Sequence, residues 1–143
     1  QDSNVQGVIV AEKTGHFWVN VNIDQYSEDQ WFAFFGHQAR QMEKSVWDAI
    51  KANGLSDSRG ITALYDISAL SLSVRSKKPL FQLLNKLLSA NFPEMVKRVH
   101  VMNAGTVFST IWSVISLLLD PDLRDKVKTH SSVPKDELLK TYE

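Results

Sequence analysis

A run of thirteen residues, 107–119, constrains the fold most, because it is apolar on every side of a helix. Nine of its side chains are aliphatic or aromatic, and only Ser109, Ser113 and Ser116 line up as a thin polar seam. A bilayer-spanning helix needs about 20 such residues, so this run is too short to cross a membrane. A helix without a polar face is either buried on all sides or meets a second apolar partner, such as a ligand or a bilayer surface.

The pattern around this run predicts one α/β domain. Residues 7–11 and 16–23 are rich in β-branched and aromatic residues and flank four turn residues, which predicts a β-hairpin. The apolar runs 60–67 and 96–103 predict buried central strands. Helices are predicted over residues 27–53, 79–90, 107–119, 121–128 and 135–142. This order predicts a mixed, largely parallel central sheet that is covered by helices.

The charge balance argues against a nucleic-acid partner. The chain has 16 basic and 16 acidic residues, whereas nucleic-acid binders usually carry a basic excess. The two halves differ, however: residues 1–70 carry 5 basic against 9 acidic residues, and residues 71–143 carry 11 against 7. Cations flank the apolar run, which suits anionic lipid headgroups, although a solvated basic face is the alternative. These cations are Lys97, Arg98, Arg124, Lys126 and Lys128.

No pattern in the chain indicates catalysis or metal binding. Cysteine is absent, the four histidines are far apart, and no glycine-rich phosphate loop or nucleophile elbow occurs. Asp66 ends a predicted central strand, where α/β active sites often lie, but no second group accompanies it. We therefore expect no enzyme, no metal ion and no cofactor other than a bound lipid. The sequence shows no signal peptide, which predicts a cytoplasmic protein.

An ordered series of short motifs in the second half resembles the Sec14-like (CRAL-TRIO) lipid-binding domain. The motifs are Asn-Phe-Pro-Glu at 91–94, Val-His-Val-Met-Asn-Ala at 99–104, Phe-Ser-Thr at 108–110, Leu-Asp-Pro at 119–121 and Lys-Val at 126–127. The resemblance implies that residues 1–143 form a single lipid-binding lobe, without the helical lobe that usually precedes it. It also implies a hydrophobic lipid pocket with a floor of strands, closed by residues 107–119 as a mobile gate helix.

The resemblance further implies which residues would contact the lipid. Glu94 and Lys126 match headgroup positions of phosphoinositide-binding members, whereas Met95 and Leu123 replace an Arg and a Thr of the same set. The residues expected to face the acyl chains are Phe108, Ile111, Trp112, Ile115, Leu118 and Leu119.

We therefore expect a protein that binds a phospholipid or another hydrophobic molecule. We also expect it to transfer that molecule between membranes through transient, peripheral contact with their surfaces. The alternative is a protein-interaction scaffold of the same fold that binds a small GTPase or itself.

Overall fold

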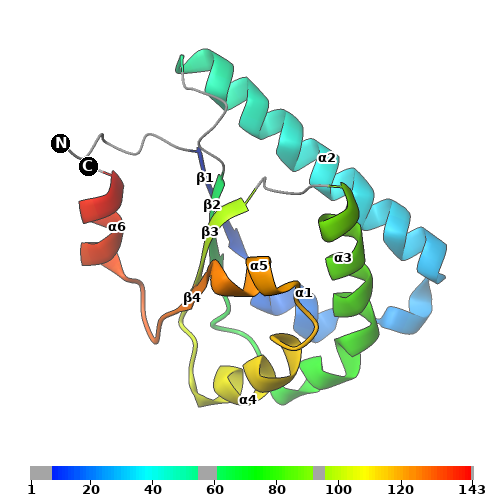
Figure 1. Cartoon of the computed structure of the whole chain (residues 1–143). Helices are drawn as coiled ribbons and strands as arrows, with labels where there is room; N and C mark the ends of the chain where they lie inside the picture. Colours follow the sequence, from blue (N-terminus) through cyan, green and yellow to red (C-terminus); the bar gives the residue numbers. More distant parts are fainter. Residues whose placement is uncertain (1–7, 55–60, 92–95, 143) are drawn as a thin grey trace.

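The computed structural model describes residues 8–54, 61–91 and 96–142, and its centre is a parallel sheet (Figure 1). In the described residues the strands are β1 (Val8–Lys13), β2 (Ile61–Asp66), β3 (Val96–Met102) and β4 (Val127–Thr129). They lie side by side in chain order, and every pair is parallel. Ala63 of β2 stands opposite Val99 of β3, which in turn stands opposite Val127 of β4.

Helices and short 3₁₀ segments connect the strands. They are α1 (Gly15–Asn20), η1 (Ile23–Gln25), α2 (Glu28–Ala52), η3 (Leu72–Lys77), α3 (Lys78–Asn91), α4 (Thr106–Ile115), α5 (Pro121–Asp125) and α6 (Lys135–Tyr142). The long helix α2 begins at a capping box, in which the Gln30 backbone N–H donates to Ser27 Oγ and the Ser27 N–H donates to Gln30 Oε1.

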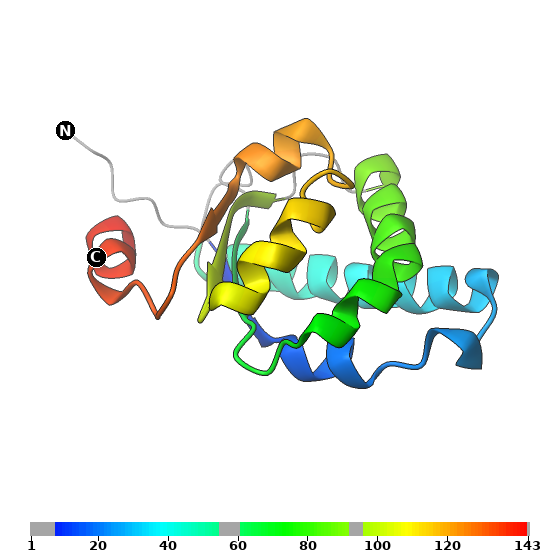
Figure 2. The same cartoon turned by 90° about the horizontal axis from the view of Figure 1, so that it is seen from below.

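All the crossovers between strands lie on one side of the sheet (Figure 2). Strands that follow one another in order, joined by right-handed connections, require this arrangement. Helix α4 packs directly on the sheet, α3 lies beyond it, and α6 lies on the opposite side. Two apolar cores result. One joins the sheet to α4, and the other joins α2 to α3 through Trp31, Phe35, Leu80, Leu83 and Leu87.

The predicted hairpin is wrong, because β1 pairs with β2 and the chain then continues as α1. Trp18 and Val21, about one helical turn apart, both pack against the α2–α3 core, and Trp18 stacks on Phe81 with ring centroids 3.9 Å apart. A Cβ on Gly15 would stand 3.1 Å from the Ala69 backbone nitrogen, so the close approach of α1 leaves little room for any side chain there. These tertiary contacts override the β-propensity of the segment, and the described sheet is parallel rather than mixed.

Two predicted helices are shorter in the structure. Helix α4 ends at Ile115, and residues 116–119 form a turn that leaves Leu117 75% exposed. Helix α5 ends at Asp125, which frees Val127–Thr129 to form β4. A three-residue strand with one apolar side chain has no periodicity, so the sequence could not indicate it. The predictions for α2, β2, α3, β3 and α6 are confirmed to within a few residues.

Candidate functional site

One face of α4 covers the floor formed by the sheet. Phe108 is buried in a cluster with Ala63, Val99 and Val101, and Trp112 stacks on Phe108 with ring centroids 5.7 Å apart. Tyr65 also belongs to this floor, and its burial, with a smaller contribution from Glu12, raises its pKa to about 12. Tyr65 therefore stays neutral near pH 7, which suits contact with an apolar molecule.

A second face of α4 borders a groove against η3 and α3, which we call the α4 groove. Ile111 is 1% exposed and lies there with Val74, which is also 1% exposed. The full lining is Val74, Arg75, Lys78, Phe81, Ile111, Val114, Ile115 and Leu118. The residues expected to face the acyl chains are thus divided, with Phe108 and Trp112 on the sheet and Ile111, Ile115 and Leu118 in the groove. Leu119 is half-buried in the turn.

The α4 groove is too small to enclose a phospholipid. Its cavity volume is about 10 Å³, which is room for about one water molecule. Pockets for drug-sized ligands are larger, at about 300 to 1,000 Å³. A phospholipid would therefore require α4 to move away from η3 and the sheet. The internal lipid pocket and the role of α4 as its gate stay predictions.

The predicted headgroup residues are only partly described. Lys126 follows α5 as its C-cap, its side chain is half-buried, and its carbonyl accepts a hydrogen bond from the Val99 N–H at 3.0 Å. Leu123 packs against the sheet cluster. Glu94 and Met95 lie outside the described residues, so the expected proximity of Glu94 and Lys126 stays a prediction.

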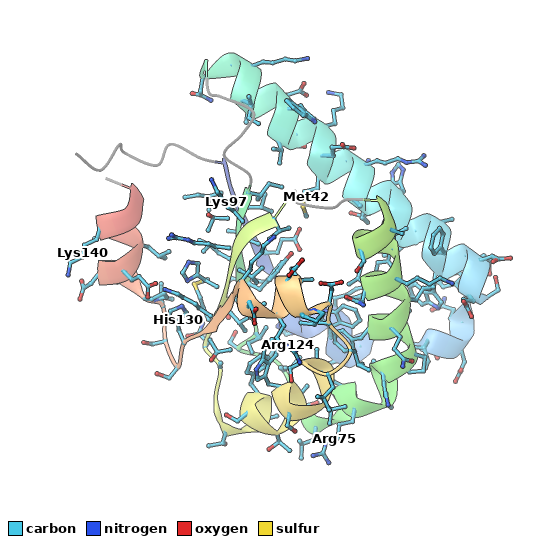
Figure 3. All side chains as sticks on the ribbon, viewed as in Figure 1. Met42, Arg75, Lys97, Arg124, His130 and Lys140 are labelled. Atoms are coloured by element: carbon cyan, nitrogen blue, oxygen red, sulfur yellow. The ribbon has the colours of Figure 1, made fainter. Side chains whose placement is uncertain are left out.

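The cations that flank the apolar run do not gather around it. Lys128 forms an ion pair with Glu137 of α6 at 2.7 Å. Arg124 Nη1 donates to the Ser116 carbonyl, 3.5 Å away, just beyond the end of α4. Figure 3 shows Lys97 far from Arg75, which lies where α4 meets η3, and Arg124 between the two.

Arg75 and Lys78 line the α4 groove instead, and the sequence analysis missed them. The sequence does show a basic cluster here, because three basic residues fall within 75–78, directly before the predicted start of α3. The sequence alone could not place this cluster beside α4, because only the packing of η3 on α4 brings the two together.

Hydrogen bonds to Asp66 join the carboxyl ends of β2 and β3. Asn103 adopts a positive φ of 59°, and its Nδ2 donates to Asp66 Oδ1 at 2.9 Å. The Ser68 N–H donates to the same oxygen at 3.0 Å. These hydrogen bonds, that of Asn103 first, hold the pKa of Asp66 below its usual value. Asp66 thus fixes the crossover next to the floor.

A histidine pair lies on the sheet face that α4 does not cover. His100 alternates with Val99 and Val101 along β3, and its Nδ1 lies 2.9 Å from Nε2 of His130. Burial lowers the pKa of His100, and the neighbouring His130 lowers it further. Within the described ranges, no group of three His, Cys, Asp or Glu residues is arranged to hold a metal ion. No helix in those ranges is both long and apolar enough to cross a bilayer.

The chain matches one family model and several relatives. The model of the CRAL/TRIO domain matches residues 3–143. Phosphatidylinositol/phosphatidylcholine transfer protein SFH7 of Arabidopsis thaliana is 23% identical over 137 residues, which cover 94% of this chain and 25% of the relative. The similarly named SFH4 of the same plant is 25% identical over 111 residues, or 74% of this chain and 18% of the relative.

A solved structure shares the fold. The crystal structure of Sfh5 matches with a TM-score of 0.63 and 18% identity, covering 91% of this chain and 45% of that one. The chain thus spans a quarter or less of these two curated relatives and under half of the matched structure.

Proposed function

Because this chain belongs to the CRAL/TRIO domain family, we propose that it binds a phospholipid or a similar hydrophobic molecule and transfers it between membranes. The observation that carries this proposal is the two-sided apolar character of α4. Phe108 and Ile111 are buried against the sheet and η3, while Val107 and Val114 on the same helix are 36% and 38% exposed. Val107 and Val114 lie one turn before and one turn after Ile111 on the same face of the helix, so the apolar stripe of α4 is only partly covered by the protein itself.

The lipid itself would stabilise the open position of α4. Moving α4 away exposes Phe108 and Ile111, and each such side chain loses about 1.5–3 kcal/mol of burial. An acyl chain that replaces these contacts gains about 0.8 kcal/mol for every methylene withdrawn from water. Two chains therefore offset the opening with a few buried methylenes each. This balance favours a closed position when lipid is absent.

We infer the headgroup position from Lys126 and Glu94. Lys126 supplies a cation at the end of α5, but Leu123 packs into the floor cluster and offers no hydroxyl. A site with half the usual polar groups discriminates weakly among headgroups. The names of SFH7 and SFH4 make phosphatidylinositol and phosphatidylcholine the first lipids to test.

Transfer requires no catalytic step, and we propose a cytoplasmic carrier that touches membranes peripherally. Its relatives are named as transfer proteins, which supports a binding role. The described part of the chain places no nucleophile beside a general base in the α4 groove, whose lining is apolar apart from two cations.

Native mass spectrometry of the purified chain tests the proposal. We expect a co-purifying or added phospholipid of several hundred daltons, bound one to one, and transfer of labelled lipid between vesicles. A ligand-free monomer that takes up neither phosphatidylinositol nor phosphatidylcholine would contradict the proposal. A ligand-free dimer would favour the scaffold alternative instead.

A further inference from the structure

Tyr65 brings a hydroxyl group to the apolar floor beneath α4. It lies on β2 in register with Val101 of β3, and it packs against the cluster that α4 covers. The row of residues two positions earlier on the same face holds Ala63, Val99 and Val127, whose side chains carry no polar atoms. Tyr65 therefore adds a hydrogen-bonding group to a surface whose neighbouring row offers none.

The Tyr65 hydroxyl has no hydrogen-bond partner among the described residues. A tyrosine hydroxyl that is removed from water usually finds one. The α2–α3 core shows the usual arrangement, because Trp31 Nε1 donates there to the Ile23 carbonyl at 2.9 Å. Burial raises the pKa of Tyr65 to about 12, so its O–H stays protonated near neutral pH. The group is therefore free to donate to a molecule that enters between the sheet and α4.

Glu12 lies next to Tyr65 on the same face of the sheet. The two residues are partners in the β1–β2 register, and Glu12 is exposed. Its negative charge adds to the rise in the pKa of Tyr65, so the two groups interact. A carboxylate or phosphate of a ligand at Tyr65 would be repelled by this charge, whereas a hydroxyl or carbonyl oxygen would not. The position therefore favours a neutral acceptor.

Tyr65 is distant from the proposed headgroup position. Lys126 directly precedes Val127, which stands in the same row of the sheet as Ala63. Tyr65 lies two residues beyond Ala63 and two strands away from β4. With a rise of about 3.3 Å per residue and about 4.8 Å between strands, the Cα atoms of Lys126 and Tyr65 are roughly 14 Å apart. The ester groups of a phospholipid adjoin its headgroup, so it is the acyl chains that reach Tyr65.

We propose that Tyr65 makes the pocket select hydrophobic ligands whose apolar part carries a neutral oxygen, such as a phospholipid with a hydroxylated acyl chain. The Tyr65 O–H donates to that oxygen once α4 has moved away from the floor. Without the Tyr65 hydroxyl, the ligand oxygen is left unpaired in an apolar site, which weakens binding by a factor of about 5 to 150. The inference rests on the proposed function, because it names the ligand class of the same pocket.

Competitive loading tests the proposal. Vesicles offer equal amounts of phosphatidylcholine with ricinoleoyl chains and with oleoyl chains, which differ only by the mid-chain hydroxyl. Native mass spectrometry then gives the ratio of the two lipids bound to the protein. We expect the wild type to load the ricinoleoyl lipid in excess of its share. In Tyr65→Phe the ratio of ricinoleoyl to oleoyl lipid should fall at least about fivefold, with total loading retained.

Tyr26→Phe is the matched control, because it removes the same hydroxyl group from a tyrosine outside the floor. Tyr26 is 47% exposed and packs edge-on against Trp31 near the start of α2. We expect its loading ratio to equal that of the wild type. Equal loading of the two lipids by the wild type would overturn the proposal. An unchanged ratio in Tyr65→Phe would do the same, as would an equal fall in Tyr26→Phe.

Total loading separates this proposal from the function on which it rests. If the wild type and Tyr65→Phe both load the two lipids without preference, the protein carries lipid and only the role of Tyr65 is wrong. If neither protein loads any phospholipid, the proposed function is wrong. A third lipid tests the requirement for a neutral oxygen: phosphatidylcholine with a chain that ends in a carboxylate should load less than the ricinoleoyl lipid, and the reverse order would overturn that requirement.

Discussion

The contact between Ile111 and η3 offers a direct test of α4 as a gate. Ile111 is 1% exposed and lies in the α4 groove with Val74. Ile111→Ala removes three carbon atoms, or about 2.4 kcal/mol at 0.8 kcal/mol for each. The cavity left behind brings the expected loss in the free energy of unfolding to about 2–5 kcal/mol.

The same contact must break whenever α4 opens. If the substitution destabilises the closed position of α4 by about 2.4 kcal/mol relative to the open one, the fraction of molecules with α4 open rises by up to about 50-fold. We therefore expect Ile111→Ala to transfer labelled phospholipid between vesicles several-fold to 50-fold faster than the wild type. Urea unfolding gives the stability, and a fluorescent transfer assay gives the rate.

Leu87→Ala is the matched control. Leu87 is 4% exposed in the α2–α3 core, and the substitution removes the same number of carbon atoms without touching α4. It should lose similar stability with an unchanged transfer rate. A folded Ile111→Ala protein whose transfer is no faster than that of Leu87→Ala would refute the gate, and would make α4 an ordinary core helix.

Three further predictions concern other parts of the molecule. Lys126→Ala should weaken binding of anionic phospholipids more than that of phosphatidylcholine in a lipid-loading assay, and equal losses would contradict the headgroup role. Trp112→Asp should abolish vesicle exchange while circular dichroism stays native, because a carboxylate beside Phe108 opposes entry of acyl chains. Burial holds the pKa of His100 below its ordinary value of 6.5, so the unfolded chain takes up the proton first and stability falls as the pH drops below about 6.5. Urea midpoints between pH 7.5 and 5 measure this fall, and His100→Gln should reduce it; an unchanged slope would show that His100 is not its source.

Short sequence patterns predicted the helices and strands whose first and last residues are marked by capping, turn or apolar residues. The Ser27 cap and the Asn53-Gly54 stop gave the ends of α2, and the uniform apolar character of residues 61–66 indicated a buried parallel strand. The segment around Trp18 could not be predicted in the same way, because its helical form depends on Phe81 and on the backbone near Ala69. Those contacts arise only after α3 and the turn behind β2 are in place.

Only part of the candidate site could be predicted, because the rest depends on tertiary packing in the same way. The apolar character of residues 107–119 pointed to α4, but it could not say which side chains face the sheet and which face η3. Arg75 and Lys78 are some thirty residues away from α4 in sequence, and only the packing of η3 joins them to it. Lys128, by contrast, was expected beside the apolar run and pairs with Glu137 across the sheet edge.

The strand order β1–β2–β3–β4 has a consequence for how the chain is made. Each strand after β1 pairs with the one synthesised just before it, so its first partner has already left the ribosome when it emerges. The sheet can grow from β1 in the direction of synthesis, with each crossover covering the newest pair as it forms. Helix α4 joins late in this sequence, onto a floor of three strands that is already assembled.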